Sequence, residues 1–161
     1  MALHKTSTPN CSGFSLVEVT MVLALFALAG SLALIISFQS LKGYSFFDTR
    51  QLLVTVLQKA RSQSLSNVCE GDDCSSGLAH GVHVDSNQFV LFQGPAYNPS
   101  DAHNVTFMLQ NSDIRLSSSE DIVFAPLTTI VVAPGSVTVT DSSGHNSTVT
   151  VGPEGQIAWS N

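Results

Sequence analysis

The cysteines and histidines are the residues of this chain best suited to chemistry. Cys69 and Cys74 form a C-x4-C pair, separated by the polar residues EGDD. In proteins that fold outside the cytoplasm, two cysteines this close in sequence form a disulfide by default. The alternative is a zinc site, for which His80 and His83 would be the other two ligands. Residues three apart in a strand point to opposite faces of the sheet, which disfavours zinc.

Little else in the sequence suits catalysis. The chain has no G-x-S-x-G nucleophile motif, no H-E-x-x-H motif and no phosphate-binding glycine loop. Its serines, histidines and aspartates are scattered, and His103 and His145 fall in turn-rich stretches where a solvated side chain is expected. We therefore expect no enzymatic activity, no cofactor and no metal.

Glu18 stands at the start of a long apolar segment. The next charged residue is Lys42, and the sequence between Glu18 and Lys42 is VTMVLALFALAGSLALIISFQSL. A carboxylate in an apolar helix costs about 3 kcal/mol at the centre of a bilayer, so it is either functional or close to the interface. Glu18 therefore either reaches the lipid head groups without a further role or has a specific partner.

The apolar segment passes the roughly 18-residue threshold for a membrane-spanning helix. Residues 14–38 would rise about 37 Å as a helix, at about 1.5 Å per residue. An ordinary signal peptide has an apolar region of only about 7–15 residues, which is too short to describe this segment. The sequence thus predicts a transmembrane helix over residues 14–38.

The leader MALHKTSTPNCSG, followed directly by FSLVEV and the apolar segment, resembles the type IV prepilin signal. In that family a prepilin peptidase cuts after a glycine and methylates the new N-terminal residue. The resemblance covers about the first 40 residues. It implies a leader over residues 1–13, cleavage after Gly13, methylation of Phe14, and pairing of Glu18 with the N-terminal amine of a neighbouring subunit.

The resemblance also implies an orientation. It places the leader in the cytoplasm and the rest outside, which makes the chain a single-pass inner-membrane protein that enters an extracytoplasmic filament. Lys5 is the one basic residue of the leader, whereas Lys42 and Arg50 follow the apolar segment, so the positive-inside rule points weakly the other way. An extracytoplasmic location favours the Cys69–Cys74 disulfide over zinc.

The helix is expected to continue beyond the apolar segment, because no proline occurs between Pro9 and Pro95. Apolar and small residues recur there at steps of three and four, which predicts that residues 39–68 form an amphipathic outer half of the helix. One face of this outer half would carry Leu53, Val56, Leu57, Ala60 and Ser64.

Residues 69–161 have the pattern of a β-rich globular head. Short alternating or β-branched segments are separated by turn formers such as DSN, APG, DSSGHN and GPEG. Strands are predicted at His80–Val84, Gln88–Gln93, Val105–Gln110, Ile122–Ala125, Thr129–Ala133, Ser136–Thr140, Ser147–Val151 and Gln156–Trp159. The order of helix, cysteine loop and strands is similar to the GspH/FimT branch of pseudopilins and minor pilins. The Gly-Arg element of DNA-binding members is absent, since Gln156 follows Gly155.

Composition limits the possible partners. Hydrophobic residues make up 43% of the chain and charged residues only 11%, whereas roughly a quarter of an ordinary soluble domain is charged. The formal net charge is -6, which disfavours nucleic acid as a partner.

The sequence as a whole predicts an α+β, pilin-like fold, with a long N-terminal helix whose first half spans a membrane and whose outer half packs on an antiparallel sheet. The resemblance implies a structural subunit, a minor pilin or pseudopilin, of a type IV pilus, a type II secretion pseudopilus or a competence pilus. Its partners would be other pilins, a prepilin peptidase, an inner-membrane assembly platform and membrane lipid. The alternatives are a ligand- or DNA-binding tip pilin and a single-span membrane enzyme.

Overall fold

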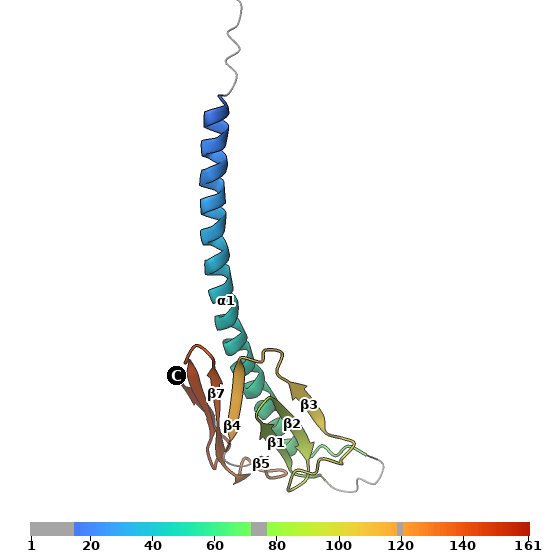
Figure 1. Ribbon diagram of the computed structural model, residues 1–161. Coiled ribbons are helices and arrows are strands. Elements are labelled where there is room, and N and C mark those ends of the chain that lie inside the picture. Colours follow the sequence, from blue (N-terminus) through green and yellow to red (C-terminus); the bar gives the residue numbers. More distant parts are fainter. Residues whose placement is uncertain (1–14, 72–76, 119–120) are drawn as a thin grey trace, which may run out of the picture. The chain divides into compact units, whose positions relative to one another are not determined.

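The computed structural model describes residues 15–71, 77–118 and 121–161, without the side chains of residues 33–43. The first element is an α-helix of 50 residues, α1 (Leu16–Leu65) (Figure 1). Its continuity agrees with the absence of proline from this stretch. The chain separates into two compact units, residues 1–41 and 42–161.

The structure of the first unit contradicts the predicted membrane span. Among the described residues, no helix combines the length and the apolarity that crossing a membrane requires. The predicted transmembrane helix over residues 14–38 is therefore wrong, and so is the single-pass inner-membrane localisation.

The second unit contains nine strands among its described residues. They are β1 (His80–Asp85), β2 (Gln88–Gln93), β3 (Val105–Met108), β4 (Ile114–Ser118), β5 (Ile122–Phe124), β6 (Val131–Ala133), β7 (Gly135–Asp141), β8 (Asn146–Val151) and β9 (Ile157–Ser160). One sheet has the order β3-β2-β1-β5-β6 and the other β4-β7-β8-β9. Every pairing in both sheets is antiparallel.

The predicted pilin-like α+β fold is therefore corrected: within residues 15–71, 77–118 and 121–161, no helix with a membrane-spanning half packs on a single antiparallel sheet. The described strands all pair antiparallel, and they form two sheets. The division occurs between β4 and β5, which are consecutive in the chain but pair with β7 and β1 respectively. Which strands pair with one another depends on residues distant in sequence, so the local sequence pattern of each strand does not predict the pairing.

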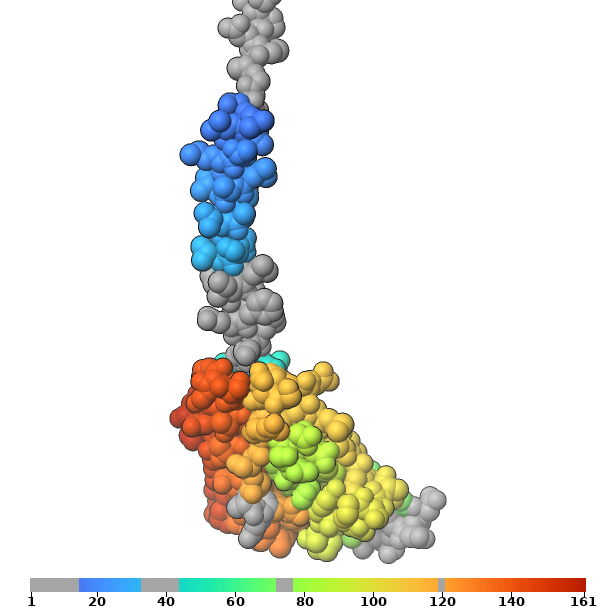
Figure 2. Space-filling view, in the orientation of Figure 1, coloured from blue at the N-terminus to red at the C-terminus, as the bar shows by residue number. Residues whose placement is uncertain are grey.

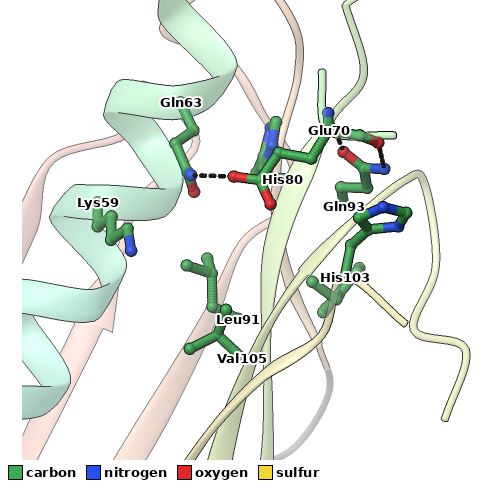
Figure 3. Close-up of a pocket in the computed structure, with 9 residues that line it drawn as sticks. Lys59, Gln63, Glu70, His80, Leu91, Gln93, His103 and Val105 are labelled. Atoms are coloured by element: carbon green, nitrogen blue, oxygen red, sulfur yellow. Dashed lines mark hydrogen bonds between the residues drawn. The ribbon is translucent and has the colours of Figure 1, made fainter. Parts of the chain in front are cut away.

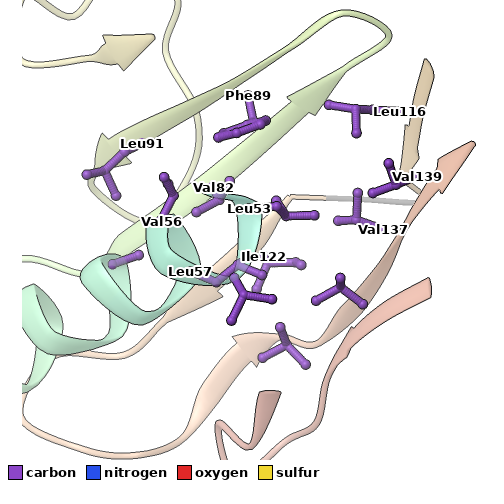
Figure 4. Packing of buried hydrophobic residues seen from close by; sticks show 14 of the residues in the cluster. Leu53, Val56, Leu57, Val82, Phe89, Leu91, Leu116, Ile122, Val137 and Val139 are labelled. Carbon is purple, nitrogen blue, oxygen red and sulfur yellow. The ribbon is translucent and has the colours of Figure 1, made fainter. Parts of the chain in front are cut away.

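The hydrophobic core lies between the residues of α1 beyond Phe46 and the inner faces of the two sheets. Leu53, Val56 and Leu57 of α1 meet Val82 and Phe89 of the first sheet, and Val137 and Val139 of the second sheet complete the cluster (Figure 4). Each such side chain contributes about 1.5–3 kcal/mol when fully buried. The predicted apolar face of the outer helix, residues 53–60, is thus the face that the core uses.

Candidate assembly surface

The N-terminal part of α1 exposes apolar side chains on all of its sides. Successive residues around the helix are exposed, from Leu16 (80%) and Val17 (70%) to Met21 (67%) and Phe26 (71%), and their side chains form a row of projections (Figure 2, blue). A helix that is apolar all round is one that becomes buried on all sides. A single groove on one partner would cover only part of this surface.

Glu18 lies in the first turn of this apolar helix. Together with Val19, Val22, Leu23 and Phe26 it lines a shallow groove of about 310 Å³, and a second groove of about 270 Å³ follows further along the helix. Grooves of this kind receive side chains from a neighbouring helix. A carboxylate in the first turn also interacts favourably with the helix dipole, by about 0.3–1 kcal/mol. Gly13 and Phe14 lie outside the described residues.

The cysteine loop follows directly after α1. Cys69 is disulfide-bonded, so it has no free thiolate for a metal, and the zinc alternative loses one of its ligands. Cys74 lies outside the described residues, and the Cys69–Cys74 pairing stays a prediction. In the described part of the chain, no group of three or more His, Cys, Asp or Glu residues could hold a metal ion.

Ser64 connects the C-terminal end of α1 to the first sheet. Its buried hydroxyl donates to the carbonyl of Phe124 in β5 (3.0 Å) and accepts the amide N–H of His80 in β1 (2.8 Å). Its own carbonyl accepts the amide of Leu127 (2.9 Å). Sequence analysis placed Ser64 on the core face of the helix but missed this role. A lone hydroxyl on an otherwise apolar face is the signal that points to it.

His80 lies in a small cavity between α1 and the first sheet (Figure 3). Its Nδ1 donates to the carbonyl of Leu78 (3.1 Å), which assigns the proton of the neutral ring to Nδ1. Burial lowers the pKa of His80, against the opposing effects of the Leu78 carbonyl and of Glu70. The cavity measures about 20 Å³, far below the roughly 300 Å³ of a small-molecule site. It is therefore a structural junction and not a ligand pocket.

Three other histidines form close pairs with aspartates. The Nδ1 atoms of these histidines lie 2.6 to 3.0 Å from a carboxylate oxygen, in the pairs His83–Asp121, His103–Asp101 and His145–Asp141. The ring of His83 also stacks on Tyr97, with 4.0 Å between the ring centroids. His80 and His83 thus contact different residues, in agreement with their expected separation onto opposite faces of β1. The His103 and His145 pairs join residues two and four positions apart and fix loops.

Comparison of the chain with protein-family models, with curated proteins and with solved structures found no match. The function of the chain must therefore be inferred from its own residues.

Proposed function

We propose that this chain is a structural subunit of a filament of the type IV pilus and pseudopilus class. In this proposal the apolar N-terminal part of α1 packs among the same helices of neighbouring subunits. The observation that carries the proposal is the exposure of large apolar side chains on every side of residues 16–32, with Glu18 as the sole charge there. A filament core built from parallel helices covers such a helix on all sides.

Glu18 has a specific role in this proposal. Inside a core of apolar helices its carboxylate needs a cationic partner, because an unpaired buried charge is costly. The prepilin-like sequence around Gly13 and Phe14 supports a source for that partner. Cleavage after Gly13 by a prepilin peptidase creates an amine at Phe14, four residues before Glu18, and a neighbouring subunit would present this amine to Glu18. Processing and assembly are then linked, and the further partners are the assembly platform and the other subunits.

The test uses the full chain, produced together with a prepilin peptidase and the filament assembly machinery. Leu23 is replaced by a photo-crosslinking amino acid, and cross-links to neighbouring subunits are measured in chains with Glu18, Glu18→Ala or Glu18→Gln. Removing one partner of a buried pair costs about 3–5 kcal/mol. We therefore expect both variants to be cleaved normally but to cross-link at least about 100-fold less, which corresponds to about 3 kcal/mol.

Thr20→Ala is the matched control, since it removes a polar group from the same exposed segment. The hydroxyl of Thr20 donates within the helix, to the carbonyl of Val17 (2.9 Å). Cross-linking of this control should equal that of the unmodified chain. If Glu18→Ala cross-links normally too, Glu18 acts only through the helix dipole and the proposed pairing is excluded.

A further inference from the structure

Two polar atoms beside the small cavity between α1 and the first sheet lack hydrogen-bond partners. Within the part of the chain that the structure describes, His80 Nε2 and Gln63 Oε1 are buried and make no hydrogen bond. His80 as a whole is only 3% exposed, and both residues line the same cavity (Figure 3). A buried polar atom without a hydrogen bond is costly, and native proteins rarely leave one unpaired. Two such atoms beside one cavity therefore point to a ligand.

Both unpaired atoms are hydrogen-bond acceptors. The Nδ1 of His80 carries the proton of the neutral ring, because it donates to the Leu78 carbonyl (3.1 Å), and this leaves a lone pair on Nε2. Burial lowers the pKa of His80 from 6.5, which keeps the ring neutral at neutral pH. The amide nitrogen of Gln63 donates to the Glu70 carboxylate (3.4 Å), which fixes the amide oxygen as the unpaired atom. The ligand must therefore donate two hydrogens.

The size of the cavity identifies the ligand. Its volume of about 20 Å³ exceeds the roughly 10–15 Å³ that one water molecule needs. It is far too small for an organic ligand, whose sites measure about 300 Å³ or more. A water molecule supplies the two hydrogens, and buried waters ordinarily bridge polar groups that would otherwise be unpaired.

Lys59 supplies a donor for the oxygen of such a water. It lies one turn before Gln63 on α1 and lines the same cavity. Its side chain is exposed, and a lysine ammonium is strongly hydrated. It therefore complements a water at the mouth of the cavity and does not take the water's place inside it.

We propose that this cavity binds one water molecule, which donates one hydrogen to His80 Nε2 and the other to Gln63 Oε1. The ammonium of Lys59 donates to the oxygen of the same water. Because Gln63 and Lys59 belong to α1 and His80 begins β1, the water joins the helix to the first sheet, next to the hydrogen bonds of Ser64. The inference concerns the second unit alone and goes beyond the proposed function, since it does not depend on filament assembly.

The test is solution NMR of the full chain with isotope-labelled histidine, at a pH where His80 is neutral. We expect the ring proton of His80 on Nδ1 and none on Nε2. The two ring C–H groups that flank Nε2 should also receive magnetisation from a long-lived water. Both observations use the unmodified chain, so they decide the question even where a variant does not fold.

Gln63→Met is the variant that removes one of the two acceptors while keeping the length of the side chain. We expect the transfer from water to His80 to fall at least about tenfold, because a buried water that loses one of its partners exchanges faster. Gln58→Met, the same substitution at an exposed position of α1, is the matched control and should leave the transfer unchanged.

Three results overturn the inference. A proton on Nε2 would do so, because that atom would then donate and not accept. The absence of transfer from water in the unmodified chain, or a transfer that a folded Gln63→Met variant leaves unchanged, would do so as well. Addition of Zn²⁺ tests the remaining occupant: a shift of the His80 Nε2 signal that saturates at one equivalent would show that the cavity takes a metal ion in place of water.

Discussion

At the scale of single residues, Ser64 is the polar group on which the junction between α1 and the first sheet depends. Ser64→Ala would leave both the Phe124 carbonyl and the His80 amide without this partner in a buried position. A buried group that loses its hydrogen bond costs about 1–3 kcal/mol, so we expect the free energy of unfolding to fall by about 2 kcal/mol. Chemical denaturation measures this directly.

The control for this prediction is Ser62→Ala, at an exposed serine two residues earlier on the same helix. Surface substitutions of this kind change stability by about 0.5 kcal/mol or less. Equal effects of the two substitutions would show that the Ser64 hydroxyl does not secure the junction.

His80 makes the stability of the head depend on pH. Burial lowers its pKa below the ordinary value of 6.5, so the unfolded chain binds a proton more readily than the folded chain. The contribution of neutral His80 is therefore complete above about pH 6.5 and is lost as the pH falls from there through the folded pKa. Lys59 of α1, Glu70 and His103 line the same cavity as His80, and of these Glu70 raises the pKa of His80.

The comparison variant is His80→Asn, which keeps a side-chain donor in the direction of Leu78 but does not titrate. We expect thermal denaturation between pH 7.5 and 5 to show a smaller loss of stability for this variant than for the unmodified chain. Asp101 does not interfere, because the backbone amide and then the ring of His103 lower its pKa from 3.8. Its contribution is consequently lost at lower pH. Parallel curves for the two chains would exclude His80 as the source of the dependence.

At the scale of elements, α1 meets two different environments. Residues beyond Phe46 supply the core of the head, while residues 16–32 expose their apolar side chains and belong to a separate compact unit. Phe26→Asn should therefore leave the thermal unfolding of the head unchanged but reduce assembly, because it puts an amide into the apolar contact. Sedimentation of the assembled material and a melting curve of the same sample measure the two effects. A lowered melting temperature with normal sedimentation would contradict this division of roles.

The sequence was informative where the pattern is local. The helix end at Leu65 and strands such as Gln88–Gln93 follow from periodicity and turn residues, and the structure has them at or near the predicted positions. Strand β4 was missed because its sequence, IRLSS, has only Ile114 and Leu116 on the buried face. The division into two sheets was also missed, since it depends on the pairing of β4 with the distant strand β7.

At the scale of the whole molecule, some features could be predicted from the sequence and others could not. Apolar length in the sequence predicted a membrane span, but no described helix is long and apolar enough for one. The exposure of Leu127 and its positive φ could not be foreseen, because they arise from the hydrogen bond between the β5–β6 turn and Ser64. Glu18, by contrast, is as isolated among apolar side chains as the sequence indicated.

The central claim, that the chain is a processed filament subunit, is tested most directly by its intact mass. The full chain is produced with and without a prepilin peptidase, and Gly13→Leu serves as the variant that the peptidase should not cut. The account predicts loss of the first 13 residues, N-methylated Phe14 in the product, and no change in the variant. A chain that still begins at Met1, or one that is cut at another position in the presence of an active peptidase, would contradict the account.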